Sequence, residues 1–326
     1  MRQHPPSDSA ARHVKDRIHD LAQGILPGSS IPARDGQRFF DDLPGFITHI
    51  GWVMLACICH NTLFSQISET FGLFIRPLIV SECKRHGIDT SGAVVDPALP
   101  TTTSIVLIVG GGERSFLTPR QGTINAYGPE HVDLARIQAG LRVLSVGSLF
   151  CAPRLDRVAL PGILQKAKEV GAVTVADLIV NPAAGGLGDI THVLPLLDYA
   201  VPSQQEAEYF TGQRDPRQAA KALLALGVSN VIVKLGERGA LFCSRDRTFE
   251  VPAFKVRVVD TTGSGDNFMA GLIYGLVRQQ PIEHALRMAA AVAALSIQAV
   301  GAGAGVVNLA QVEQFLAAYP DRELHT

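Results

Sequence analysis

The sequence predicts an α/β fold: a doubly wound, mostly parallel sheet flanked by helices. Short apolar segments typical of buried strands alternate with helical segments, and this alternation is clear from about Gly72. One strand-like segment also runs into a glycine-rich turn that opens an apolar helix. The chain has 326 residues, 47% of them hydrophobic, enough for one large domain with a small appendage or for two domains. Such sheets bind ligands beyond the carboxyl ends of their strands.

The expected elements follow in chain order. Residues 1–30 form an N-terminal extension with a helix whose apolar stripe runs from Val14 to Ile25. Residues 31–71 lack a clear pattern, and residues 72–326 form the α/β domain. Within that domain helices are predicted at 73–85, 160–170 and 205–210, and strands at 101–109, 113–117, 141–145, 173–177, 199–202, 230–234 and 239–243.

The composition argues against several kinds of partner. The formal net charge is −1 and there is no long Lys/Arg run, so no strong field attracts nucleic acid or an anionic membrane. The most apolar run, Phe46 to Cys59, is too short to span a bilayer, and the first thirty residues are too polar for a secretory signal. Five cysteines, an odd number, indicate reduced thiols. We therefore expect a cytoplasmic protein without nucleic-acid or membrane partners.

The most informative segment is Asp260–Asp266, which reads Asp-Thr-Thr-Gly-Ser-Gly-Asp. It follows a strand-like segment, Phe254–Val259, and precedes an apolar run typical of a helix. Backbone N–H groups at a helix N-terminus attract phosphate oxygens, and glycines let the backbone approach an anion closely. A carboxylate repels phosphate, so Asp266 is predicted to accept the proton of an attacking hydroxyl. The alternative is a tight loop in which Asp266 is a helix N-cap.

This segment closely resembles the signature D-T-x-G-A-G-D of the PfkB-type, ribokinase-like carbohydrate kinases, with Ser264 in the alanine position. The resemblance extends over residues 72–319. It implies a ribokinase-like fold with a small β lid, and phosphorylation of a sugar hydroxyl with ATP and Mg²⁺. By this resemblance Asp266 is the general base, and the backbone N–H groups of the Gly263–Gly265 turn stabilise the transferring phosphoryl group.

A second motif supports the resemblance. The strand ending at Lys234 breaks into Gly236 and Gly239. In the family a similar segment lies along the phosphates and ribose of ATP, often with threonine in the position of Lys234. A lysine there is long enough to reach a phosphate. The alternative is an ordinary hairpin turn.

A third motif, Ser203–Glu206, resembles the family's N-x-x-E, with Ser203 in place of asparagine on the ATP side. Glu206 matches the glutamate that helps to place magnesium through water, as suits an ion that keeps much of its hydration shell. The same spacing fits a capping box in which Ser203 caps the following helix, and both interpretations can hold together.

A fourth motif is a small-residue helix predicted at 289–303, which ends in a Gly-Ala turn at Gly301. The family has a comparable turn near the adenine, where small residues make room for the base or pack closely on the sheet. Relatives often bind a monovalent cation beside this turn. By resemblance Asp260 and Thr262 supply oxygens to such an ion, K⁺, and Thr262 also lies on the ATP side.

Residues 101–104 and 112–116 resemble the family's lid hairpin, which excludes water so that the phosphoryl group goes to the sugar. Arg114 and Arg120 are candidates for contacts with sugar or phosphate, or are solvated lid charges. Lids in the family often pair, which implies a homodimer through the lid.

The N-terminal part departs from the family. Relatives begin with a strand whose aspartate binds sugar hydroxyls, followed by a Gly-Gly-x-x-x-Asn segment, and residues 31–71 contain neither. A shifted reading frame or an altered start upstream of Gly72 is one hypothesis for the difference. Two other functions stay open: a nucleotide-binding remnant without turnover, and a nucleoside or vitamin kinase of the same superfamily. A Rossmann dehydrogenase is disfavoured because no early strand carries Gly-x-Gly-x-x-Gly.

Overall fold

The structure is a computed structural model that describes residues 78–96, 98–99, 101, 105–108, 114–117, 123–181 and 185–319. The expected extension 1–30, the region 31–71 and Arg120 lie outside the described residues. Residues 78–85 are helical, within the helix predicted at 73–85.

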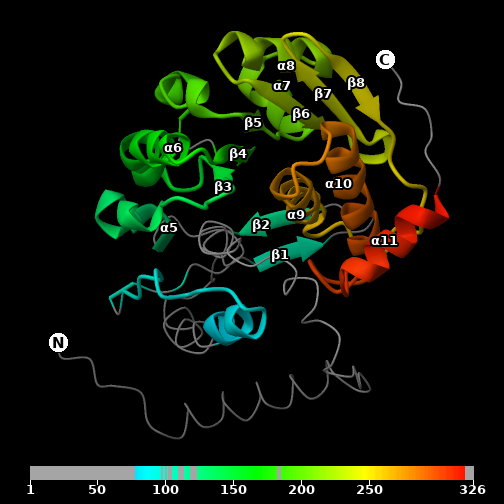
Figure 1. Ribbon diagram of the computed structural model, residues 1–326, viewed down its shortest axis with the longest axis horizontal. Coiled ribbons are helices and arrows are strands. Elements are labelled where there is room, and N and C mark those ends of the chain that lie inside the picture. Colours follow the sequence, from blue (N-terminus) through cyan, green and yellow to red (C-terminus); the bar gives the residue numbers. More distant parts are fainter. Residues whose placement is uncertain are drawn as a thin grey trace, which may run out of the picture. The chain divides into compact units, whose positions relative to one another are not determined.

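A six-stranded sheet forms the centre of the described fold (Figure 1). Neighbouring strands are parallel from β3 to β6, and β7 and β8 are added antiparallel. The mostly parallel sheet predicted from the alternation is therefore confirmed. In spatial order the strands are β3 (Val143–Leu149), β4 (Val173–Leu178), β5 (Tyr199–Ala200), β6 (Asn230–Lys234), β7 (Ala240–Ser244) and β8 (Thr248–Val251).

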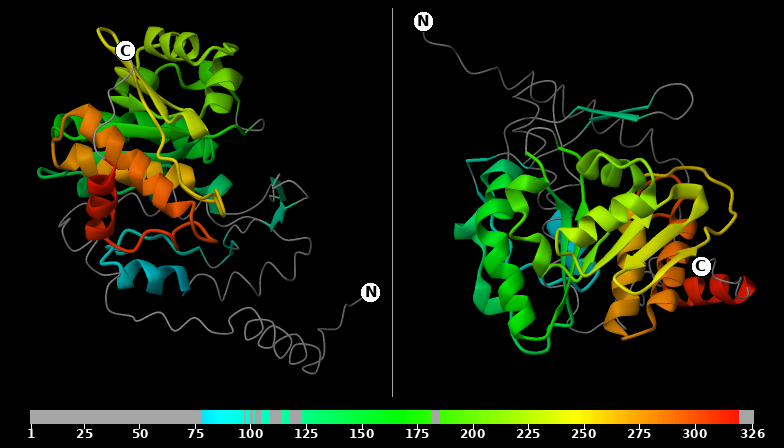
Figure 2. Two further views of the ribbon diagram at one scale, coloured as in Figure 1. Left: turned by 90° about the vertical axis from the view of Figure 1, so that its right-hand side faces the viewer. Right: turned by 90° about the horizontal axis from the view of Figure 1, so that it is seen from above.

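Helices cover both faces of this sheet (Figures 1 and 2). Alternation along β6 sends Val231 and Val233 into the core under α6, α7 and α8, and Ile232 into the core under α9 and α10. The next residue with the orientation of Ile232 is Lys234, so its side chain lies on the α9 side. The helices are α5 (Thr123–Ala126), α6 (Leu160–Glu169), α7 (Gln204–Thr211), α8 (Pro216–Ala225), α9 (Ser264–Val277), α10 (Ile282–Ser296) and α11 (Leu309–Ala318).

A separate two-stranded sheet corresponds to the predicted hairpin. Its strands are β1 (Ile105–Ile108) and β2 (Arg114–Leu117), and they pair antiparallel with Ile105 opposite Leu117. Short strands of this kind need a packing partner for stability. The lid role of the hairpin stays a prediction.

Two predicted elements differ in the structure. Residues 254–259 are not a strand, because Phe254 packs its ring on Phe315 of α11 and the N–H of Val259 donates to the carbonyl of Ile297 (2.8 Å) instead of to a strand. The helix predicted at 289–303 is α10, which already ends at Ser296. Its small residues pack closely on α9, where Gly271 lies against Ala289.

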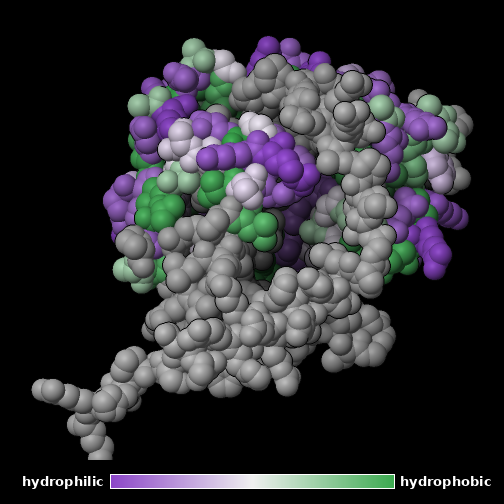
Figure 3. Space-filling view, turned by 90° about the horizontal axis from the view of Figure 1, so that it is seen from below, coloured by the Kyte–Doolittle hydropathy of each residue, from purple (hydrophilic) through white to green (hydrophobic). Residues whose placement is uncertain are grey.

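The described surface seen from below mixes hydrophilic and hydrophobic residues (Figure 3). Within the described part of the chain, no helix combines the length and the apolar character needed to cross a bilayer.

Candidate active site

The carboxyl ends of β4 and β6 bring two opposite charges together. Lys234 Nζ donates to Asp177 Oδ1 at 2.7 Å, and both side chains are about 15% exposed. Burial alone would lower the pKa of Lys234, but the surrounding carboxylates outweigh it and the pKa is raised. Lys234 is therefore a fixed positive charge at the edge of the sheet where ligands of such folds bind.

The glycine-rich turn opens α9 directly beside this lysine. Gly263 is the N-cap of α9 and has φ +71°, a conformation in which glycine is preferred. The Asn267 amide holds the turn by donating to the Gly263 carbonyl at 2.9 Å. A Cβ added at Gly265 would lie 3.4 Å from Lys234 Nζ, so the ammonium group reaches the backbone of the turn. The helix N-terminus and the lysine thus place positive charge in one spot.

Asp266 lies in the first turn of α9, and the N-cap is Gly263, so the alternative of Asp266 as N-cap is wrong. Burial and, to a smaller extent, the charge of Asp177 raise the pKa of Asp266, the charge of Lys234 lowers it, and the resulting pKa is about 6. A carboxylate with this pKa is ionised at neutral pH and is a stronger proton acceptor than an exposed aspartate.

Glu206 lies in the first turn of α7 and takes part in a capping box. Ser203 N donates to Glu206 Oε2 at 2.6 Å, and Glu206 N donates to Ser203 Oγ at 3.2 Å. The capping-box alternative is therefore confirmed. Burial raises the pKa of Glu206, against the charge of Lys234, and the charge of Asp177 raises it further. The same carboxylate thus caps a helix and interacts electrostatically with the lysine pair.

Asp260 joins two turns. One carboxylate oxygen accepts from Thr262 N (3.0 Å) and Thr262 Oγ1 (2.7 Å), and the other accepts from Gly301 N (2.9 Å). Asp260 and Thr262, predicted to supply oxygens to a monovalent cation, therefore lie together, and Asp260 joins them to Gly301 of the turn predicted near the adenine.

The remaining predicted residues, Gly236, Gly239 and Arg114, lie in a turn and in the β1–β2 hairpin. Gly236 and Gly239 bracket the 3₁₀ turn between β6 and β7, and the N–H of Leu235 donates to the Gly239 carbonyl at 2.7 Å. This matches the hairpin-turn alternative and leaves the ATP contact a prediction. Arg114 is the first residue of β2.

The sequence analysis missed Asp177. This residue follows a run of buried strand residues, Thr174–Ala176, near the carboxyl end of β4. A polar residue there is the signal that could have identified it, because ligands of parallel sheets bind at that edge.

The sequence model of the pfkB family carbohydrate kinases matches residues 77–308, more than half of the chain. The chain belongs to the pfkB family of carbohydrate kinases. The matched range lies within the residues over which the motifs predicted the resemblance.

Individual relatives agree with the pfkB family. The chain is 35% identical to a deoxyribokinase of Salmonella typhi over 234 residues, 70% of each chain. It is 30% identical to an uncharacterised sugar kinase of Archaeoglobus fulgidus over 229 residues, 70% of this chain and 89% of that one. A crystal structure of ribokinase II from E. coli in complex with ATP and Mg²⁺ has a TM-score of 0.65 at 25% identity, covering 74% of this chain and 79% of the other.

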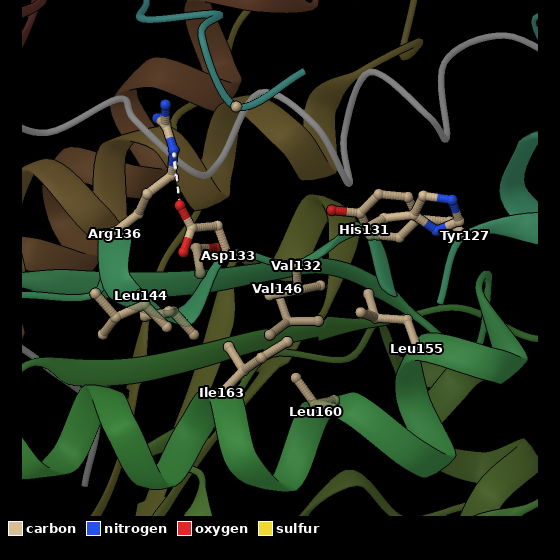
Figure 4. A pocket seen from close by; sticks show the side chains of 13 residues that line it. Tyr127, His131, Val132, Asp133, Arg136, Leu144, Val146, Leu155, Leu160 and Ile163 are labelled. Carbon is tan, nitrogen blue, oxygen red and sulfur yellow. Dashed lines mark ion pairs between the residues drawn. The ribbon is translucent and has the colours of Figure 1, made fainter. Parts of the chain in front are cut away.

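A pocket on β3 is separate from the pfkB motifs (Figure 4). Its volume is about 80 Å³, and none of the predicted site residues lines it. The rings of Tyr127 and His131 stack at one end of this pocket, and Arg136 pairs with Asp133 at the other. Its apolar lining includes Leu144 and Val146 of β3, Leu155, and Leu160 and Ile163 of α6.

Two glycines of the pfkB motifs offer a matched test of close packing. Gly263 (φ +71°) and Gly236 (φ +62°) have similar positive φ angles, but a Cβ at Gly263 would lie 2.7–2.9 Å from atoms of Ala302, whereas a Cβ at Gly236 meets no atom within 4 Å. We expect Gly263→Ala to lower the free energy of unfolding by about 1–3 kcal/mol more than Gly236→Ala does, measured by urea denaturation. Equal losses would contradict the close approach of the two turns.

Proposed function

We propose that this protein transfers the γ-phosphoryl group of ATP to a hydroxyl of a sugar or sugar derivative. The observation that carries the proposal is that a lysine, a glycine-rich turn and a carboxylate lie together at the N-terminus of α9. The largely buried Lys234 reaches the Gly263–Gly265 turn, and Asp266, a carboxylate of raised pKa, lies one residue beyond that turn. Positive charge for a phosphoryl group beside a proton acceptor for a hydroxyl is the combination that phosphoryl transfer to an alcohol requires.

Each residue has a defined part in this proposal. Asp266 takes the proton of the attacking hydroxyl. The backbone N–H groups of the Gly263–Gly265 turn and the Lys234 ammonium group stabilise the negative charge on the equatorial oxygens of the transferring group. Asp177 holds Lys234 in place through the 2.7 Å ion pair. Gly236, Gly239, Ser203, Thr262 and Gly301 are proposed to line the ATP side.

Two ions belong to the proposal. Among the described residues, no group of three His, Cys, Asp or Glu side chains is arranged to hold a metal ion by itself. One Oε of Glu206 is occupied by the capping bond, so Mg²⁺ bound to ATP is proposed to contact Glu206 through water. K⁺ is proposed to bind beside Asp260 and Thr262, where carboxylate and hydroxyl oxygens lie together. Mg²⁺ would neutralise phosphate charge.

The partner proposed is a small sugar, with Arg114 and Arg120 as candidate contacts from the lid. The relatives include a deoxyribokinase, which favours a small sugar. A homodimer that pairs through the β1–β2 hairpin and a cytoplasmic location are proposed with it.

The function is tested by ADP release with ATP and Mg²⁺ over a panel of D-ribose, 2-deoxy-D-ribose, D-fructose, sugar acids and nucleosides. Release that depends on a sugar and is lost in Asp266→Ala supports the proposal. Release with nucleosides alone points to a nucleoside kinase. Binding of ATP to the folded protein without release for any acceptor indicates a nucleotide-binding remnant and contradicts the proposal.

The pKa of Asp266 predicts the pH dependence of the rate. The carboxylate must be ionised to accept a proton, so kcat/KM should be level at neutral pH and fall as the pH drops through about 6. Well below that pH, kcat/KM should fall by almost tenfold for each pH unit. An initial-rate profile from pH 4.5 to 8.5 at saturating ATP measures it, and a rate that stays level to pH 5 would rule out this base.

A further inference from the structure

A strained turn ends β3 at the carboxyl edge of the sheet. Ser148 has φ +55° and Phe150 has φ +83°, left-handed values that cost a non-glycine residue about 1–3 kcal/mol each. The pairing of β3 with β4 is irregular just before Leu149, which lies opposite Leu178. Since Leu178 follows Asp177 in the chain, the turn lies next to the candidate active site.

A buried carboxyl group holds this turn. Asp156, in the π-helical turn Leu155–Ala159, is 3% exposed, and its Oδ2 accepts from the backbone N–H of Phe150 at 3.0 Å. Burial raises the pKa of Asp156 to about 7, against the backbone N–H groups of Phe150 and Ala152 and the charge of Arg157. Both the ionised and the protonated carboxyl group keep an oxygen that accepts from Phe150.

Two further contacts fix Phe150. Asn181 Nδ2 donates to the Phe150 carbonyl at 3.0 Å, and the Phe150 ring stacks on Phe210 of α7 with centroids 4.5 Å apart. The turn is therefore held from three elements, including the helix whose first turn contains Glu206. Strained conformations persist where the surroundings over-determine them, and they cluster at functional sites.

The topology places this turn on one side of Asp266. Among the residues proposed for ATP, Ser203 follows β5, Gly236 and Gly239 follow β6, and Thr262 and Gly301 lie in two turns joined by Asp260. In the sheet β4 and β3 lie on the other side of β5 from β6. In phosphoryl transfer the attacking and leaving oxygens are roughly in line, on opposite sides of the phosphorus. The acceptor is thus expected on the side of β4 and β3, where the Ser148–Phe150 turn lies.

We propose that Asp156 is a positioning residue for the acceptor, which it serves by fixing the Ser148–Phe150 turn through the backbone of Phe150. The inference rests on the proposed phosphoryl transfer and extends it to a residue that touches neither ATP nor the reacting atoms. Its specific consequence is an effect on acceptor affinity that leaves ATP affinity unchanged.

The test compares Asp156→Ala with Asp156→Asn, which keeps a side-chain oxygen for the Phe150 N–H. For the most active sugar of the panel, Asp156→Ala should raise KM about tenfold or more, since small misplacements of a positioning group are costly. KM for ATP should stay within about twofold in both variants, and Asp156→Asn should restore most of the sugar affinity. Asn181→Ala removes the hydrogen bond to the Phe150 carbonyl and so loosens the same turn. It replaces Asp156→Ala in this test if that variant does not fold.

The control is Asp198→Asn at the opposite edge of the sheet, where Asp198 accepts from the backbone N–H of Thr174 at 2.9 Å. It should lower the melting temperature without changing KM for the sugar. An unchanged sugar KM in folded Asp156→Ala or Asn181→Ala, with an active wild type, overturns this inference alone. Equal changes in the KM of sugar and ATP also overturn it. A folded wild type without sugar-dependent ADP release overturns the proposed function, and this inference falls with it.

Discussion

Asp266→Ala should lower turnover by about 10²–10⁴-fold, the usual contribution of a general base. ATP binding should survive and even strengthen, because the variant removes a negative charge beside the phosphates. The protein should keep its fold, since Asp266 is not the N-cap of α9. Steady-state ADP release measures turnover, and calorimetric titration with ATP and Mg²⁺ measures binding.

Asp266→Asn is the matched control for this expectation, because it keeps the shape of the side chain and loses only the basic oxygen. Its turnover should be as low as that of the alanine variant. Turnover within tenfold of wild type in either variant would contradict the role of Asp266. Loss of ATP binding together with turnover would assign Asp266 to nucleotide binding instead.

Lys234→Met is expected to have the largest combined effect on stability and activity. It leaves the largely buried Asp177 without its partner, and removing one member of a fully buried ion pair costs about 3–5 kcal/mol, which is the upper limit expected here. It also removes the cation at the Gly263–Gly265 turn, a loss expected to cost about 10²–10³-fold in kcat. Because the charge of Lys234 lowers the pKa of Asp266, the acid limb of any remaining activity should move above pH 6.

Two further variants separate the loss of stability caused by Lys234→Met from its loss of activity. Lys168→Met breaks an ion pair with the same 2.7 Å distance to Asp198 but with side chains 36% and 27% exposed, and it should cost at most about 1 kcal/mol. The double variant Lys234→Met/Asp177→Leu should recover most of the stability but not the activity. Urea denaturation and ADP release measure the two effects. Equal destabilisation by Lys234→Met and Lys168→Met would contradict the buried pair.

The predictions from sequence succeeded where a pattern is local. Strand β6 was predicted at its observed limits, because its interior is uniformly apolar and a polar residue precedes it. The strand predicted at 254–259 was wrong, because Phe254 packs on an aromatic side chain of α11, which is distant in sequence, and the segment does not pair with a strand. The end of α10 was set too late because small residues continue beyond Ser296.

The site was predictable only in part. The Gly263–Asp266 turn is contiguous in sequence, so its chemistry could be argued from spacing. The pair of Asp177 and Lys234 spans 57 positions and depends on which strands are neighbours, which the alternation of strands and helices does not determine. Glu206 shows that two interpretations of one spacing are compatible, since its carboxylate both caps α7 and interacts with the lysine.

The divided carboxylate of Asp260 has a consequence for motion. One of its oxygens accepts from Thr262 and the other from Gly301, so the loop after α10 can move away from the segment before α9 only when one of these hydrogen bonds breaks. Segments linked in this way open as one cooperative unit, and the slowest amides of both should exchange with solvent at a common rate. We therefore expect the start of α9 and the loop after α10 to open together, with Asp260 as the link between them.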